Sequence, residues 1–212
     1  PAMRYAEPSM YFHKYHGLGN DYIILNPKEY ERPLTEGDIR RVCHRNYGIG
    51  SDGILWGPLR PSSSGADFKL RIFNPDGSEA EKSGNGLRIF ARYLYDKSQV
   101  SATPFRLETL GGIVTAQVLD NGRSVTVDMG QVSFQSDKIP VTGPLREVVQ
   151  EEIQIGDRIL QYCGATIGNP HCVIPVDAVS KDMVMRLGPL VENHEAFPNR
   201  INLQIMKAID AA

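Results

Sequence analysis

The segment Ser83-Gly84-Asn85-Gly86 lies where the chain changes from an extended pattern to a helical one. The run before it, 66–82, alternates in polarity and then turns at Asn74-Pro75-Asp76-Gly77, which is typical of a strand followed by a tight turn. The run after it, 87–97, places apolar side chains on one helical face, namely Leu87, Phe90, Ala91 and Leu94. The pattern predicts a helix over 86–97 with that face in the core.

Ser83 is the expected N-cap of this helix, because a serine hydroxyl accepts a backbone N–H of the first turn. A plain cap needs only Ser83. Glycines on both sides of Asn85 indicate in addition that something approaches the backbone closely. Open N–H groups at the positive end of a helix bind carboxylate or phosphate. The segment therefore predicts a small-anion site, with a bare helix cap as the alternative.

Composition narrows the classes of function. The chain has 212 residues, 41% of them hydrophobic, and a net charge of −2, so it can form a real core and is not built for nucleic acid or an anionic membrane. The sequence shows neither an apolar run of about 20 residues nor a signal peptide, and we expect a cytoplasmic protein. Three widely spaced cysteines, Cys43, Cys163 and Cys172, predict neither a disulfide framework nor a metal site.

The order of the patterns predicts an α+β fold in two lobes, 11–130 and 131–212. In the first lobe we expect strands at 11–16, 22–26, 53–57 and 67–73, and a helix from a Thr35 cap to Cys43. Three further strands follow the helix at 86–97, two of them joined by a hairpin at Asp120-Asn121-Gly122.

The second lobe follows what we interpret as a linker containing Pro140, Gly143 and Pro144. It begins with a hairpin across Gly156-Asp157. A strand at 171–176, a short helix at 181–187 and a strand at 200–209 complete it. If this lobe mirrors the first, it lacks a long central helix and closing strands of its own, and we expect the chain to be cut short.

Six segments together resemble the diaminopimelate epimerase family. They are HGLGNDYIILN (16–26), HRNYGIGSDGIL (44–55), RIFNPDGSEAEKSGNG (71–86), VDMG (127–130), GNPHCV (168–173) and LGPLVENHEAFPNRINLQIM (187–206). The resemblance implies two pseudo-symmetric lobes, each a curved, mainly antiparallel sheet around a central helix, with the second lobe incomplete here. It also implies an isomerase of lysine and cell-wall biosynthesis that converts LL- to meso-diaminopimelate.

Members of this family use two cysteines on opposite faces of the substrate and neither pyridoxal phosphate nor a metal. The resemblance places the substrate's α-carboxylate at Gly84, Asn85 and Gly86. It further implies that four asparagines grip the polar ends of the substrate in one cleft between the lobes: Asn20, Asn74, Asn169 and Asn202. Taken singly, each asparagine is equally a turn former, Asn74 before Pro75 above all.

Two departures from the family pattern concern catalysis. The first catalytic cysteine falls at Ser83, and a hydroxyl is far less acidic than a thiol, whose pKa is about 8.5. An engineered replacement, a paralogue with another role and a one-base enzyme are the three explanations left open. Residues 207–212 also do not supply the segment that carries the second cysteine. Cys172, Cys163 and Cys43 are interpreted as buried structural thiols.

His171 is the remaining chemical candidate, because the matching histidine of the family lies near the thiols and tunes their ionisation. Gly53 stands where some members carry a substrate-contacting glutamine. The predicted partner is a small amino acid, with no nucleic acid, no membrane and no cofactor, and a homodimer is an open alternative. Competing interpretations are a catalytically dead amino-acid-binding or interaction protein, and an isomerase of the phenazine-biosynthesis or proline-racemase kind; the side-chain specificity is open.

Overall fold

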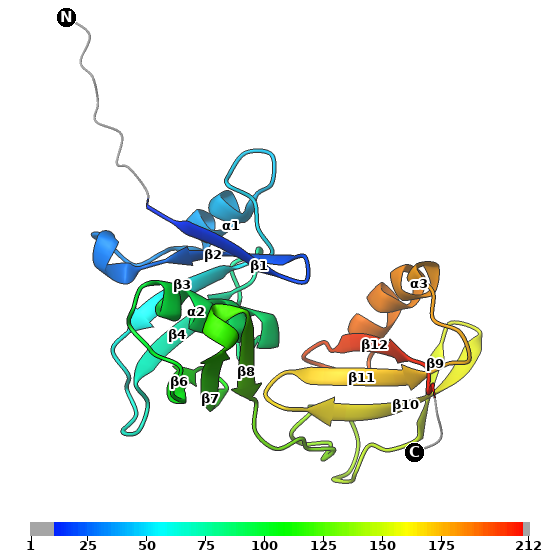
Figure 1. Ribbon diagram of the computed structural model, residues 1–212. Coiled ribbons are helices and arrows are strands. Elements are labelled where there is room, and N and C mark those ends of the chain that lie inside the picture. Colours follow the sequence, from blue (N-terminus) through cyan, green and yellow to red (C-terminus); the bar gives the residue numbers. More distant parts are fainter. Residues whose placement is uncertain (1–10, 210–212) are drawn as a thin grey trace, which may run out of the picture. The chain divides into compact units, whose positions relative to one another are not determined.

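The computed structural model describes residues 11–209, and the chain divides into two compact units, the first ending at Met129 and the second beginning at Gly130 (Figure 1). The last three residues of the predicted C-terminal segment 207–212 lie outside the described range. Within residues 11–209 no helix has both the length and the apolar character needed to cross a bilayer.

The first unit is built on one mixed sheet. Its elements are β1 (His13–Gly17), β2 (Asn20–Leu25), the short 3₁₀ helix η1 (Pro27–Glu29), α1 (Glu36–Cys43), β3 (Ile54–Leu59), β4 (Phe68–Phe73), β5 (Glu79–Ala80), α2 (Gly84–Asp96), β6 (Phe105–Thr109), β7 (Gly112–Leu119), the 3₁₀ turn η2 (Asp120–Gly122) and β8 (Ser124–Asp128). The strands follow the order β1-β2-β3-β4-β6-β7-β8, with β5 beside β4. Only β2/β3 and β4/β6 pair in parallel among the described strands of this unit, so the predicted mainly antiparallel α+β arrangement is confirmed.

Helix α2 lies inside the curl of this sheet. It contacts β1 and β2 near one end of the strand order and β7 and β8 at the other, which requires the sheet to bend around it (Figure 1). The helical face predicted from the sequence is confirmed, since four side chains are fully buried: Leu87, Phe90, Ala91 and Leu94. Burying such side chains contributes about 1.5–3 kcal/mol each, so α2 organises the larger core of the unit.

The opposite face of the sheet is covered by α1. As predicted, Thr35 caps this helix, and Asp38 completes a capping box by accepting from the Thr35 backbone N–H. Alternating residues of β2 separate the two cores: Tyr22 and Ile24 pack with α2, and Ile23 packs with α1. Both faces of the sheet are therefore buried at β2 and β3.

The second unit contains a four-stranded sheet with the order β12-β11-β10-β9 within the described residues. Its elements are β9 (Glu151–Ile155), β10 (Arg158–Thr166), β11 (Pro170–Pro175), α3 (Lys181–Glu192) and β12 (Asn202–Met206). The hairpin across Gly156-Asp157 is confirmed. The helix runs past the predicted end at 187 and contains Pro189, because Leu187 and Val191, one turn apart, are both buried against the sheet.

The segment interpreted as a linker belongs to the core of the second unit, which corrects that expectation. Ile139 and Val148 are buried with the sheet residues. Gly164 of β10 admits them, because a Cβ at Gly164 would lie 3.0 Å from Val148 Cγ1 and 3.1 Å from Ile139 Cδ1. The prolines and glycine there shape a packed loop.

The two units share a strand–helix–strand repeat. In the first, the antiparallel pair β1–β2 is followed by α1 and then by β3, which pairs in parallel with β2. In the second, the antiparallel pair β10–β11 is followed by α3 and then by β12, parallel to β11. Tyr22 lies two residues after Gly19-Asn20, and His171 lies two residues after Gly168-Asn169, the Gly-Asn pairs at the turns that lead into β2 and β11. By this spacing Tyr22 and His171 occupy equivalent positions.

Candidate functional site

Three predicted positions meet at one end of the first sheet. Asn20 begins β2, and Gly53 directly precedes β3, which runs parallel to β2. Asn74 directly follows β4, which runs antiparallel to β3 with Ile54 opposite Phe73. The sheet therefore places Asn20, Gly53 and Asn74 at the same edge. Between the strands predicted at 11–16 and 22–26 the chain makes a tight two-residue turn, with Gly17 paired to Asn20 and positive φ at Leu18 and Gly19.

The start of α2 is where the sequence predicts an anion site, and the structure shows which of its N–H groups are open to a ligand. Ser83 Oγ accepts the backbone N–H of Gly86 at 3.1 Å, which confirms the cap. This bond occupies one of the three N–H groups assigned to a carboxylate, so within the described residues only those of Gly84 and Asn85 remain open. Packing explains the glycine at position 86, because a Cβ there would lie 3.1 Å from Leu55 Cδ2. Packing does not explain Gly84, which is half-buried with no atom closer than 3.6 Å to its ideal Cβ.

Asn20 is held by a charged network. Its Nδ2 donates to Asp52 Oδ2 at 3.0 Å, and Asp52 is fixed by Arg45, which also bonds Asp21 at 2.8 Å. Arg45 and Lys14 hold the pKa of Asp21 well below its usual range. Because the amide hydrogens of Asn20 face Asp52, its Oδ1 is left to accept a hydrogen bond from a ligand.

Asn85 lies beside this hairpin. Its Oδ1 is 3.7 Å from an ideal Cβ at Gly17, the register partner of Asn20. The same oxygen accepts from the Arg88 guanidinium, so the Asn85 amide hydrogens point elsewhere and can donate. Asn74 donates from Nδ2 to Ser78 Oγ at 3.0 Å, which leaves its Oδ1 as an acceptor.

These groups complement a free α-amino acid. The two open N–H groups of α2 and the amide of Asn85 donate, as a carboxylate requires. The carbonyl oxygens of Asn20 and Asn74 accept, as an ammonium requires. The helix N-terminus adds a positive potential at the carboxylate end.

Tyr22 is a functional candidate that sequence reasoning missed. Its hydroxyl lies 3.0 Å from Ser83 Oγ, and its ring is buried between Gly53 and the α2 core. Burial raises the pKa of Tyr22, so the phenol stays protonated. The signal in the sequence is weak: an inward strand position in NDYII that carries a hydroxyl.

The second unit holds the other three predicted residues. His171 of β11 is opposite Asn202 of β12, and its Nδ1 is 2.9 Å from Gln204 Oε1, which makes Nδ1 the protonated nitrogen and leaves Nε2 available. Asn202 donates to the Pro170 carbonyl at 3.0 Å, and Asn169 precedes β11 with its backbone carbonyl bonded to Thr166. That they join the first unit's residues in one cleft stays a prediction.

The structure tests the prediction that the three cysteines are buried. Cys43 and Cys172 are buried as predicted, whereas Cys163 is half-buried, which corrects that expectation. Burial raises the pKa of the Cys172 thiol to about 12, so it does not form thiolate near neutrality. Among residues 11–209 the structure contains no cluster of three or more metal-binding side chains.

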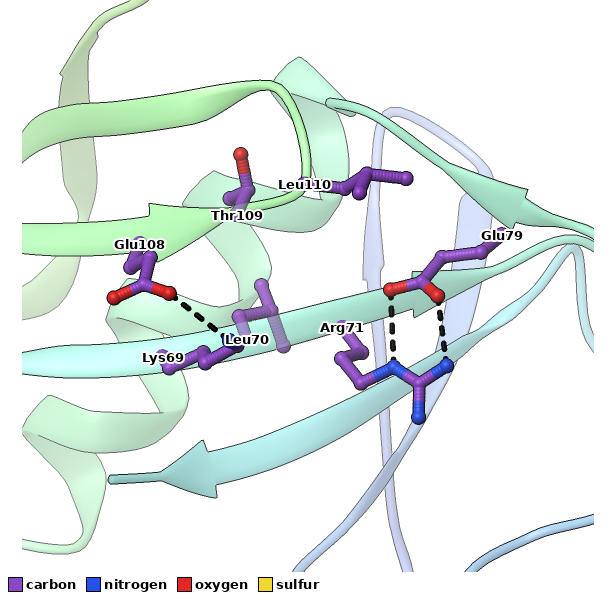
Figure 2. A pocket seen from close by; sticks show the side chains of 7 residues that line it. All are labelled: Lys69, Leu70, Arg71, Glu79, Glu108, Thr109 and Leu110. Atoms are coloured by element: carbon purple, nitrogen blue, oxygen red, sulfur yellow. Dashed lines mark hydrogen bonds and ion pairs between the residues drawn. The ribbon is translucent and has the colours of Figure 1, made fainter. Parts of the chain in front are cut away.

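A pocket of about 480 Å³ opens on the first unit between β4, β5 and β6 (Figure 2). Its charged side chains pair with one another: Arg71 bonds Glu79 twice, at 3.0 and 2.7 Å, and Lys69 lies 2.9 Å from Glu108. Glu108 also accepts the backbone N–H groups of Ser62 and Ser63, which lowers its pKa to about 2. None of the predicted site residues in 11–209 lines this pocket. Its charged side chains hold the loop at 60–65 in place.

Comparison with known sequences identifies close relatives. The sequence model of the family described as diaminopimelate epimerase matches residues 12–135. Diaminopimelate epimerase 2 of Nostoc sp. strain PCC 7120 is 56% identical over 201 residues, covering 95% of this chain and 70% of that protein. The diaminopimelate epimerase of Heliobacterium modesticaldum is 40% identical over 207 residues, covering 94% of this chain and 73% of that protein.

Comparison with solved structures gives the same fold. A probable proline racemase from Agrobacterium radiobacter K84 superposes with a TM-score of 0.66 at 16% identity, covering 94% of this chain and 67% of that one. At this identity the likeness concerns the fold alone.

Proposed function

The chain belongs to the diaminopimelate epimerase family, whose members are isomerases, and we propose that its substrate is LL-diaminopimelate. The proposed substrate site rests on one observation. Two open N–H groups and an asparagine amide at the start of α2 lie beside Ser83, the residue at the first catalytic position. We further propose a role in lysine biosynthesis in the cytoplasm, where its three unpaired cysteines stay reduced.

The proposed reaction needs no cofactor. A base at position 83 breaks the Cα–H bond and takes the proton, and the electron pair is delocalised into the α-carboxylate. The N–H groups of Gly84 and Asn85 stabilise the charge that develops there. A second group on the opposite face then delivers a proton and inverts the centre. Asn169, His171 and Asn202 are proposed to act on the same substrate.

Ser83 favours a second candidate function, binding without turnover. A serine hydroxyl is a poor base without a partner that removes its proton. We therefore propose that proton abstraction from the position-83 face is impaired in this chain, while the groups that bind carboxylate and ammonium stay in place. A homodimer is an open alternative, and nucleic acid and membranes are not expected partners.

Exchange of the substrate α-proton with solvent deuterium tests this proposal. We expect no exchange of LL-diaminopimelate above a Ser83→Ala control in the unchanged 212-residue chain, and measurable exchange in Ser83→Cys. Exchange by the unchanged chain above that control would refute the impairment and make Ser83 a base. Calorimetry with LL-diaminopimelate, histidine and proline shows whether the chain binds an amino acid without turnover or binds none. It also reports the side-chain specificity of binding.

A further inference from the structure

We propose that Tyr22 is a positioning residue that donates a hydrogen bond to the side chain at position 83 and thereby sets the acidity of that side chain. The inference rests on the proposed function for its catalytic consequence only. Tyr22 lies 61 residues from Ser83 along the chain, and the sheet brings its hydroxyl to 3.0 Å from Oγ.

The direction of this hydrogen bond follows from burial. Tyr22 is 7% exposed, and residues 11–209 offer its hydroxyl no acceptor besides Ser83. The distance alone lets either hydroxyl donate, but a buried hydroxyl that donates to nothing is disfavoured, whereas Ser83 is only half-buried and can give its proton to solvent or to a bound molecule. Tyr22 therefore donates. Ser83 Oγ accepts from Tyr22 and from the Gly86 N–H, and its own proton is left for a bound molecule.

Gly53 makes room for the Tyr22 ring. A Cβ at position 53 would lie 2.7 Å from Tyr22 Cε1 and 2.6 Å from the Phe73 carbonyl oxygen. Any side chain there would move the ring. Gly53, where some family members carry a glutamine, and Ser83 thus both lie against Tyr22.

The repeat within the chain supports the assignment. Tyr22 and His171 each lie two residues after a Gly-Asn pair at the turn that leads into their strand, Gly19-Asn20 before Tyr22 and Gly168-Asn169 before His171. Each repeat therefore places a side chain able to transfer or share a proton at the same point of its sheet.

A thiol at position 83 gives a direct readout. A thiolate there would accept from Tyr22 and Gly86, and hydrogen bonds to the charged form lower a pKa. The charged groups around the start of α2 include Glu81, Lys82, Arg88 and Asp52, and all four are the same in every variant below.

The experiment compares Ser83→Cys alone, with Tyr22→Phe, and with Tyr15→Phe. Tyr15 is the control because it is the cross-strand partner of Tyr22 and loses a comparable hydrogen bond, to Asp96 at 2.9 Å. The rate at which iodoacetamide alkylates the thiol introduced at position 83 is followed by peptide mass spectrometry between about pH 6 and pH 10, a range that brackets the thiol pKa.

We expect Tyr22→Phe to move the profile to higher pH and to slow alkylation at pH 7 by about 3–10-fold, with Tyr15→Phe matching the parent. No shift, or an equal shift in the Tyr15→Phe variant, overturns the proposal. Alkylation of the thiol needs no turnover of substrate. If the pH profile of alkylation shifts but the substrate α-proton does not exchange, the result contradicts the proposed function and leaves the role of Tyr22 intact.

If the Ser83→Cys variants do not fold, the proposal is tested by hydrogen exchange in chains that keep Ser83. Tyr22→Phe should speed exchange of the Gly86 amide, because Ser83 then loses one of the two bonds that hold its cap. Tyr15→Phe should not. Equal exchange rates at Gly86 in the two variants would overturn the proposal.

Discussion

The two units use the same strand–helix–strand repeat but differ in how much of the sheet is covered. In the first unit β2 presents Ile23 to the α1 core and Ile24 to the α2 core, and both residues are fully buried. In the second unit Cys172 is buried on the α3 side, while Val173, its neighbour on the opposite face, is only half-buried. The repeat accounts for one core, and the second core of the first unit depends on α2.

This difference also concerns chemistry. The helix that completes the first unit brings the open N–H groups, the cap at Ser83 and Asn85 to the sheet edge that carries Asn20 and Asn74. In the described part of the second unit, α3 stands at the place of α1, and the predicted residues lie on strand ends. A sheet of this kind positions side chains, whereas a helix start adds backbone donors.

The largest expected effect comes from breaking the α2 core. Phe90→Asp buries an unpaired carboxylate at a fully buried position, which costs several kcal/mol in a unit with about 5–15 kcal/mol of stability. Hydrogen exchange resolved by peptide should show lost protection over 13–128 and retained protection over 151–206. Gln99→Asp, at an exposed position after the helix, is the control. Unchanged protection in the first unit would mean that α2 is not its organising element.

Two alanine substitutions, one in each unit, test whether the first sheet is covered on both faces and the second on only one. Ile24→Ala should cost about 2–5 kcal/mol because the residue is fully buried, whereas Val173→Ala, at the equivalent position of β11, should cost less than about 1 kcal/mol. The free energies of unfolding are measured by denaturant titration with a probe in each unit. Similar costs at the two positions would contradict the comparison.

Two glycines at the start of α2 should respond in opposite directions. Gly86→Ala should destabilise by about 1–3 kcal/mol, since its Cβ would lie 3.1 Å from Leu55 Cδ2 and 3.2 Å from Ser83 Oγ. Gly84→Ala meets nothing nearer than 3.6 Å and should stabilise by up to about 1 kcal/mol through helix propensity. Thermal unfolding measures both. If Gly86→Ala does not change the stability, packing does not explain why residue 86 is a glycine. Close approach of a ligand to the backbone would then be the remaining explanation.

The smallest effect is a pH dependence in the first unit. The pKa of Glu108 is lowered to about 2 by the N–H groups of Ser63 and Ser62 and by Lys69. A lowered pKa means that its contribution is complete above the unfolded value of about 4.3 and is lost as the pH falls toward 2. Glu108→Gln should therefore lower the melting temperature slightly at pH 7 and not at pH 2. A deficit of equal size at both pH values would show that the charge is unimportant.

Sequence patterns predicted the elements whose signal is local. The spacing of Leu87, Phe90 and Leu94 identified the buried face of α2, and Ser83 and Thr35 identified two caps, because caps and helical periodicity depend on neighbours within one turn. Where packing decides the end of an element, the prediction was wrong: the helix predicted to end at 187 continues to Glu192, with Leu187 and Val191 both buried against the sheet.

By itself the sequence determined the α+β class, the order of the elements, the resemblance to an epimerase family and the presence of Ser83 at its first catalytic position. Only the tertiary structure decided that the Gly86 N–H belongs to the cap, that Asp52 orients Asn20, and that Tyr22 reaches Ser83 across 61 residues. The physical reason is strand pairing, which brings distant residues to one sheet edge through a register that no local pattern encodes.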